Sequence, residues 1–362
     1  MTTGLTTDGC RARQRALREH LDRNQLDAAL IGDRRHVHYL TGYWCPAVFA
    51  SVALLEHDGP TTLVTPHRLD FVPAADVTLH YPAQRRATLI DDQPGAAVEM
   101  IAESLRRCER VGVDGPVLPW AHPSAAWADL RPALLTMRRH KNADEVELLW
   151  RAIAATEAAY AYAFKALRPG VTEVELFAGM QAAAAEYASE VLGEFGNDFQ
   201  VGSPGGPPRR RPAQAGEVAV FDLSVTLRGY RSDMCRSFVV GRLPSTEQTD
   251  ARERILAVLR YVERTAQPGV SCRQLYADAA TQLEGYRGWS FPHHLGHGIG
   301  LSAHEAPRLN PEWDDTFQVG DVFTAEPGLY GPDLRAGLRI EEIYHLTETG
   351  LEKLTTFPTE LS

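Results

Sequence analysis

The chain has 362 residues, of which 44% are hydrophobic and 23% are charged. This is the composition of a soluble globular protein, and it excludes disordered and collagen-like chains. With no uninterrupted stretch of about 18 apolar residues, the sequence also argues against a membrane protein. The formal net charge of −10 opposes binding to a nucleic-acid backbone.

The N-terminal segment and the cysteines both favour a cytoplasmic protein. The first twenty residues carry charge early and lack the apolar core of a signal peptide. The five cysteines are widely scattered and include no Cys-x-x-Cys pair, which is typical of reduced thiols. We therefore expect a cytoplasmic protein that does not associate with membranes.

The first third of the chain alternates helix-like and strand-like segments, which predicts an α/β domain. We expect the following elements: helices over residues 11–24 and 96–108, and strands over 27–32, 49–55, 61–64 and 111–114. A long helix rich in alanine and glutamate then runs from Ala143 to about Lys165. We place a domain boundary near residue 140, which gives an α/β domain over 1–140 and a mixed α/β (α+β) domain over 141–362.

The second domain contains an internal similarity. Residues 169–178 (PGVTEVELFA) recur in similar form as residues 268–277 (PGVSCRQLYA). Each copy follows a helical stretch, and each has a Thr or Ser positioned to cap the next helix. The pattern predicts a duplicated unit with a site at the junction of its halves.

Two predicted hairpins carry pairs of acidic residues. Strand-forming residues flank a turn near residues 227–229, and a turn centred between 227 and 228 places Asp222 opposite Asp233. A second turn, centred near residues 333–334, places Glu326 opposite Glu341. Facing carboxylates on half-buried strands repel one another unless a cation lies between them.

Histidines gather between the two hairpins. Four of the 13 histidines fall within residues 293–304, beside glycines that favour close approach of the backbone to a ligand: His293, His294, His297 and His304, with Gly296, Gly298 and Gly300. Four carboxylates and an imidazole form a hard ligand set suited to Mn²⁺, Co²⁺, Fe²⁺ or Zn²⁺. Two divalent ions would balance the four negative charges, which predicts metal-assisted hydrolysis.

These motifs resemble those of the pita-bread metallopeptidases, the group of Xaa-Pro dipeptidase (prolidase), aminopeptidase P and creatinase. The resemblance rests on Asp-x(10)-Asp, Gly-His-Gly-Ile-Gly-Leu-x-x-His-Glu, Glu-Pro-Gly and Arg-Ile-Glu, within residues 222–342. Residues 39–42 (YLTG) resemble the creatinase/prolidase N-terminal domain. The resemblance is greatest to Xaa-Pro dipeptidase. It implies a creatinase/prolidase-like domain over 1–140 and a duplicated pita-bread catalytic domain over 141–362.

The resemblance also implies roles for individual residues. Five positions match the family's metal ligands: Asp222, Asp233, His297, Glu326 and Glu341. Of these, Asp233 and Glu341 would bridge two ions and Glu326 would also shuttle a proton. His304 would stabilise the oxyanion, and His293, or its neighbour His294, would help seat the proline. Arg339 would hold a ligand carboxylate.

The sequence departs from the family pattern in three places. Asp222 is followed by Leu-Ser224 where a residue and then glycine are usual, and Cys235 replaces a threonine. The loop over residues 201–211 lacks the usual substrate-contacting histidine and has Arg209 near its position. We list Arg209 as a candidate substrate residue for that reason. Arg308 is another candidate, because it could bind the free carboxylate of a dipeptide.

The function implied is hydrolysis of Xaa-Pro bonds in short proline-containing peptides by a metal-bridged hydroxide, with Mn²⁺ as the favoured ion. A hydrolase or lyase of a non-peptide amide or small osmolyte is the first alternative, because of the altered 201–211 loop. A non-catalytic peptide-binding relative is the second. The family resemblance also implies a homodimer.

Overall fold

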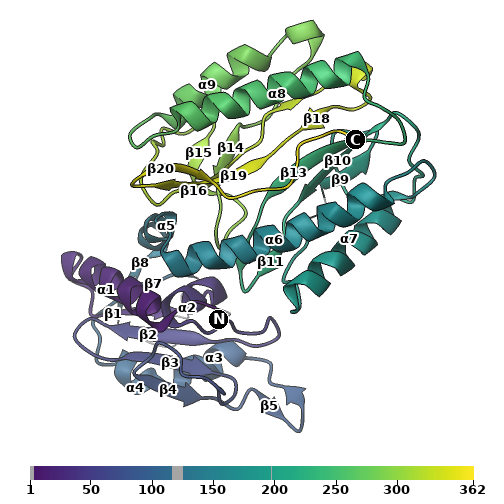
Figure 1. Ribbon diagram of the computed structural model, residues 1–362. Helices are drawn as coiled ribbons and strands as arrows, with labels where there is room; N and C mark the ends of the chain where they lie inside the picture. The colour runs from purple at the N-terminus through teal and green to yellow at the C-terminus, as the bar shows by residue number, and fades with distance from the viewer. Residues whose placement is uncertain (1–3, 116–124, 197) are drawn as a thin grey trace. The chain divides into compact units, whose positions relative to one another are not determined.

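The computed structural model describes residues 4–115, 125–196 and 198–362 (Figure 1). The chain divides into two compact units, Met1–Arg138 and Arg139–Ser362. Within the described ranges, none of the helices combines the length and apolar character needed to cross a membrane.

The first unit is built on a six-stranded mixed sheet with the strand order β4-β3-β2-β1-β7-β8. Its elements are α1 (Thr7–Arg23), β1 (Ala28–Ile31), α2 (Arg34–Thr41), β2 (Val52–Glu56), β3 (Thr61–Thr65), β4 (Val77–His80), β5 (Gln84–Arg85), β6 (Thr88–Leu89), α3 (Gln93–Glu99), α4 (Ala102–Leu105), β7 (Arg110–Val113), β8 (Ala126–Asp129) and α5 (Arg131–Arg139). The predicted helix over 96–108 is two helices, because Ile101 adopts φ −114° and leaves the helical region. Ile101 is buried in the core of the unit.

The second unit consists of two helix pairs and two main antiparallel sheets. Its elements are α6 (Ala143–Ala166), α7 (Glu173–Ala188), β9 (Asp198–Val201), β10 (Val218–Leu223), β11 (Thr226–Leu227), β12 (Tyr230–Arg231), β13 (Met234–Val239), α8 (Thr246–Thr265), α9 (Cys272–Leu283), β14 (Gly296–Gly298), β15 (Glu305–Leu309), β16 (Val322–Ala325), β17 (Gly328–Leu329), β18 (Leu338–Arg339), β19 (Glu342–Thr347) and β20 (Gly350–Lys353). The sheets have the orders β13-β10-β9 and β15-β14-β16-β19-β20. They meet where Glu341 N–H donates to the Cys235 carbonyl at 3.0 Å.

The two helix pairs repeat the same local design, as the internal similarity predicts. Thr172 caps α7 by accepting from Glu175 N–H, and Ser271 caps α9 by accepting from Gln274 N–H. In each copy the glycine of the Pro-Gly turn has positive φ. Figure 1 shows α6 and α7 on one side of the strands and α8 and α9 on the other.

The first acidic hairpin has a different register from the predicted one. In the β10–β13 ladder, Asp222 lies opposite Cys235 and not opposite Asp233, which comes just before β13. The turn is centred between Arg228 and Gly229, whose φ angles of 49° and 85° fit a two-residue hairpin turn. Moving the turn centre by one residue shifts each cross-strand partner by two.

The second acidic hairpin keeps the predicted register. Ala325 pairs with Glu342 in the β16–β19 ladder, and Gly328 pairs with Arg339 in the β17–β18 ladder. Both ladders continue the alignment that sets Glu326 against Glu341.

The glycines of β14 allow neighbouring strands to pack closely. A Cβ atom on Gly296 would lie 2.0 Å from the Thr324 carbonyl oxygen, and one on Gly298 would lie 2.1 Å from the Ala306 carbonyl oxygen. The predicted close approach therefore exists, but it is to neighbouring backbone. This packing places His297 inside the unit, 4% exposed.

Candidate metal centre

A cavity of about 400 Å³ opens where the two acidic hairpins meet the histidine-rich segment over residues 293–304, which includes β14. Its lining is mostly polar or charged: Gly196, Asp198, Asp222, Ser224, Arg231, Asp233, His293, His294, His297, His304, Glu326, Arg339 and Glu341. All five residues matched to metal ligands are among them. Residues more than a hundred positions apart in the sequence thus share one site.

The ligand atoms in this cavity fall into overlapping groups of three, and within each group they lie within 4.8 Å of one another. Asp233, His297 and Glu341 form one group, and Asp222, Glu326 and Glu341 form another. Glu341 belongs to both groups. A third group consists of the histidines at 294, 297 and 304.

The carboxylates repel one another in this buried position. Burial raises the pKa of Asp222 to about 7, although the charge of Arg339 opposes the rise. Burial, reinforced by the charges of Asp222 and Glu326, raises the pKa of both Asp233 and Glu341 well above the usual range. A cation placed among them would reverse these shifts.

Two imidazole rings stack beside the carboxylates. The rings of His297 and His304 lie 3.8 Å apart between centroids and are tilted by 16°. Burial lowers the pKa of His297 to about 4, which keeps the ring neutral and able to act as a ligand. Its Nε2 atom lies 3.8 Å from Oδ2 of Asp233 and 3.5 Å from Oε1 of Glu326. Burial also lowers the pKa of His304.

His294 contacts a candidate ligand directly. Its Nε2 atom lies 2.8 Å from Oε1 of Glu326. Burial alone would lower the pKa of His294, but the hydrogen bond and charge of Glu326 outweigh it and raise the pKa. Burial alone would raise the pKa of Glu326, yet His294 and the other histidines lower it to about 2.

His293 lies on the same wall but makes different contacts. Its Nε2 atom is 2.9 Å from the hydroxyl of Tyr330, and its Nδ1 atom is 2.8 Å from the His294 carbonyl oxygen. The adjacent histidines are therefore not equivalent, because only His294 contacts Glu326. The sequence pattern gives no signal for Tyr330, and its role beside His293 emerges only from their contact in the structure.

Arg339 holds two carboxylates at the cavity wall. Its Nη2 atom lies 2.8 Å from Oδ2 of Asp222 and 2.6 Å from Oδ2 of Asp198. This contact accords with the expectation that Arg339 holds a ligand carboxylate. Asp198, at the start of β9, is a cavity residue that sequence reasoning missed, because no motif contains it.

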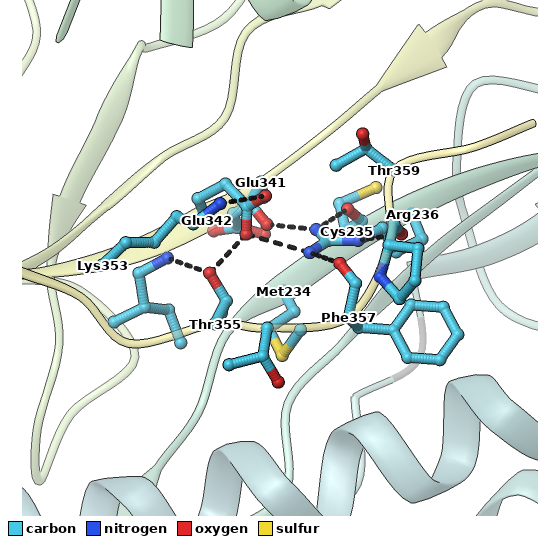
Figure 2. A network of polar contacts seen from close by, with 12 residues as sticks. Met234, Cys235, Arg236, Glu341, Glu342, Lys353, Thr355, Phe357 and Thr359 are labelled. Atoms are coloured by element: carbon cyan, nitrogen blue, oxygen red, sulfur yellow. Dashed lines mark hydrogen bonds and ion pairs between the residues drawn. The ribbon is translucent and has the colours of Figure 1, made fainter. Parts of the chain in front are cut away.

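A buried arginine in β13, Arg236, contacts the backbone and a side chain of the second hairpin (Figure 2). Arg236, 1% exposed, donates from Nη1 to the carbonyls of Glu341 (2.6 Å) and Cys235 (3.0 Å). Its Nη2 atom donates to Oε2 of Glu342 (2.9 Å) and to the Phe357 carbonyl (2.8 Å). The backbone of Glu341 is thereby tied to β13.

The structure does not bring the other two predicted arginines into the lining of the cavity. Arg209 forms a two-pronged pair with the buried Glu173, with Nε–Oε2 at 2.9 Å and Nη2–Oε1 at 2.6 Å. Arg209 therefore ties the loop to α7, and its predicted contact with substrate stays a prediction. Arg308 lies 3.3 Å from Asp315 and over the ring of Trp313.

The residues present fit a metal centre. Oε2 of Glu341 is buried and has no hydrogen-bond partner among the described residues. Such an atom is costly unless something positive contacts it. Carboxylate oxygens with a neutral imidazole are the donor set that first-row divalent ions prefer.

Comparisons with known proteins agree with this geometry. Residues 147–348 match metallopeptidase family M24, and residues 13–139 match the creatinase/prolidase N-terminal domain. The Bacillus subtilis protein YkvY is 33% identical over 275 residues, which cover 73% of this chain and 72% of that protein. An Xaa-Pro dipeptidase of Pyrococcus horikoshii is 25% identical over 360 residues, covering 95% and 96%.

Solved structures share the fold over nearly the whole chain. The prolidase from Pyrococcus horikoshii superposes with a TM-score of 0.80 at 22% identity, covering 97% of this chain and 100% of that one. The X-Pro aminopeptidase from Thermotoga maritima gives 0.78 at 23% identity, covering 96% and 98%. With the mixed α/β architecture and the carboxylate-histidine cavity, these findings establish that the chain belongs to metallopeptidase family M24.

Proposed function

We propose that the protein is a metal-dependent peptidase that cleaves the bond before proline in dipeptides or other short peptides. The observation that carries the proposal is one cavity lined by four carboxylates, by His297 and by His304, whose ring stacks on that of His297. The names of relatives, which include Xaa-Pro dipeptidase, support the bond type.

We assign the metal ligands as Asp222, Asp233, His297, Glu326 and Glu341, with two divalent ions, Mn²⁺ being the favoured one. Divalent ions held there would lower the pKa of water and polarise the scissile carbonyl. Glu326 carries the proton from the attacking water to the imino nitrogen of the leaving proline, since its low pKa keeps it ionised at the start. His294 orients Glu326 through their 2.8 Å contact.

The two remaining histidines act on the substrate. His304 is kept neutral by burial and donates an N–H to the developing oxyanion. His293, held by the Tyr330 hydroxyl, contacts the proline ring. Arg339 keeps Asp222 in place and does not need to contact the peptide.

We further propose that residues 1–140 form the creatinase/prolidase-like domain and 141–362 the pita-bread catalytic domain. The family matches over 13–139 and 147–348 support this division. By analogy with the fold family we propose a homodimer that acts in the cytoplasm.

The loop over residues 201–211 favours a second candidate, a hydrolase or lyase of a non-peptide amide. Arg209 stands where a histidine is expected and is paired with Glu173, so this loop offers no imidazole to the substrate. A panel of Gly-Pro, Ala-Pro, longer Xaa-Pro peptides and N-acyl amino acids, each with Mn²⁺, Co²⁺ or Zn²⁺, separates the two candidates.

The proposal is tested by one substitution in each hairpin, Asp233→Asn and Glu341→Gln. We expect each to lower Mn²⁺-dependent Gly-Pro hydrolysis about a thousandfold or more, and to lower bound metal measured by elemental analysis. Asp314→Asn, at an exposed side chain paired with Arg273, is the matched control. We expect it to retain both the Gly-Pro hydrolysis and the bound metal of the wild type. Wild-type protein that binds no divalent metal, or an Asp233→Asn variant as active as wild type, would refute the proposal.

A further inference from the structure

One wall of the cavity carries a polar pair that the assigned mechanism does not use. Arg231 lies in β12, and Ser224 lies in the link between β10 and β11. Nη2 of Arg231 donates to Oγ of Ser224 at 2.6 Å. Both residues line the cavity, as does Gly196, whose N–H donates to the Ser224 carbonyl. Ser224 is the residue that stands where the family pattern has glycine.

Arg231 has spare hydrogen-bonding capacity in a largely buried position. Its side chain is 17% exposed, and its Nε atom is buried without a hydrogen-bond partner among the described residues. Its acidic contact is with Glu194, at 3.2 Å, and that carboxylate is 69% exposed. A buried guanidinium with an unused donor is costly unless an acceptor enters the site.

The other arginine in the lining is already engaged. Arg339 pairs with Asp222 and Asp198 at 2.8 and 2.6 Å, so its charge is matched within the protein. Of these two arginines in the described lining, Arg231 is the one whose ion pair is with an exposed carboxylate, that of Glu194, which an incoming anion could replace.

The guanidinium is also near the reacting groups. The backbone N–H of Arg231 donates to the Gly300 carbonyl at 3.1 Å, which fixes β12 beside the segment that follows His297. Burial and His294 are the main causes that lower the pKa of His304, and the charge of Arg231 adds to them. The pair thus lies within electrostatic reach of the residue assigned to the scissile carbonyl.

We propose that Arg231 and Ser224 bind the free C-terminal carboxylate of the substrate, so that the enzyme prefers Xaa-Pro dipeptides to longer or amidated peptides. This inference rests on the proposed Xaa-Pro hydrolysis. The planar guanidinium can donate two N–H groups to one carboxylate. The Ser224 hydroxyl accepts from Arg231 and therefore keeps its own proton to donate to the same carboxylate.

This assignment differs from the one made from the sequence, which placed the carboxylate at Arg308. Arg308 is engaged by Asp315 and Trp313 and is not part of the described lining. The two arginines therefore make opposite predictions for the same measurement.

The test compares Gly-Pro with Gly-prolinamide, which has the same scissile bond and no free carboxylate, using the Mn²⁺-loaded enzyme. Arg231→Gln should raise KM for Gly-Pro about tenfold or more, with kcat within about threefold, and should leave Gly-prolinamide nearly unchanged. Ser224→Ala should shift KM in the same direction by a smaller factor, and Arg231→Lys should fall between wild type and Arg231→Gln. Arg228→Gln, at a turn residue paired with Glu190, is the control that keeps the wild-type ratio.

A binding measurement accompanies the kinetics. Calorimetric titration should show that Arg231→Gln weakens binding of L-proline about tenfold and leaves L-prolinamide unaffected. Equal losses for the acid and the amide, or an Arg308→Gln variant that alone removes the preference, would overturn the inference while leaving Xaa-Pro hydrolysis intact. Wild-type enzyme that hydrolyses neither peptide would instead contradict the proposed function, and the dipeptide preference with it.

Discussion

The two acidic hairpins reach the same cavity by different geometries. In the second hairpin, the ladders on either side align Glu326 with Glu341. In the first, Asp222 lies opposite Cys235, and Asp233 lies beyond the end of the ladder. A carboxylate pair can therefore line one cavity without being cross-strand partners. What both hairpins need is a support that keeps their buried carboxylates in place.

The supports also differ. Arg339 contacts the Asp222 side chain itself, whereas Arg236 holds the backbone of Glu341 and the side chain of Glu342. The Arg339 contact neutralises the charge of Asp222 at the cavity. The Arg236 contacts hold the start of β19 through the Glu341 backbone and the Glu342 side chain. Substitutions can separate these two effects.

The largest effect on stability is expected for Arg236→Met. The substitution leaves the buried carboxylate of Glu342 without its buried cationic partner and removes the donors to two hairpin carbonyls, so we expect a loss of about 3–5 kcal/mol. Urea unfolding of the metal-free protein measures it. Arg273→Met, at a half-exposed side chain paired with the exposed Asp314, should cost about 1 kcal/mol or less. A cost for Arg236→Met no larger than this control would show that the second hairpin does not need its support.

A smaller effect concerns pH and the first hairpin. Because the pKa of Asp222 is about 7 in the folded protein and 3.8 ordinarily, the folded state holds more protons between about pH 4 and 7. The stability of the metal-free protein should therefore fall as pH rises through this window. We expect Tm to be about 5 °C or more lower at about pH 8 than at about pH 5, and Mn²⁺ to restore it.

Asp222→Asn is the control for that measurement, because it removes one titrating carboxylate and should make the slope shallower, while Asp233 and Glu341, whose pKa values are also raised, still titrate. A Tm of the metal-free wild type that rises between these pH values would contradict the expected sign.

The smallest effect is expected at the turn that sets the first register. Gly229 has φ 85°, so Gly229→Ala should cost about 1 kcal/mol through backbone strain. Gly115→Ala is a matched control, because Gly115 lacks positive φ and a Cβ there would meet nothing within 4 Å. If Gly229→Ala proves as mild as the control in thermal unfolding, the turn does not determine the register.

Much of the fold and site was predictable from the sequence, because local patterns carry it. Alternating segments indicated the α/β unit, and the repeated Pro-Gly turns indicated paired helices in the second unit. The acid and histidine spacings indicated the residues that the structure gathers in one cavity. The predicted turn centre led to the correct register for the second hairpin. For the first hairpin, the predicted turn centre lay one residue too early, because the two central turn residues are Arg228 and Gly229, which both have positive φ.

Other features depend on contacts between distant segments and leave no local trace. Asp198 reaches Arg339, and Tyr330 reaches His293, only in the folded unit. The sequence did not reveal the ion pair of Arg209, because its partner, Glu173, lies in another element, α7. The departure at Ser224 was visible in the sequence, but its meaning required the 2.6 Å contact with Arg231.

The grouping of Asp233 with His297 and Glu341 has a consequence for how the chain is held together. An ion bound by this group would close a loop of about a hundred residues, since the group joins β13 to β14 and β19. Closing so long a loop restricts the unfolded chain in the way that a disulfide does. The ions would then act as reversible cross-links between the duplicated halves. Chelation would loosen the second unit as a whole, beyond removing its chemistry.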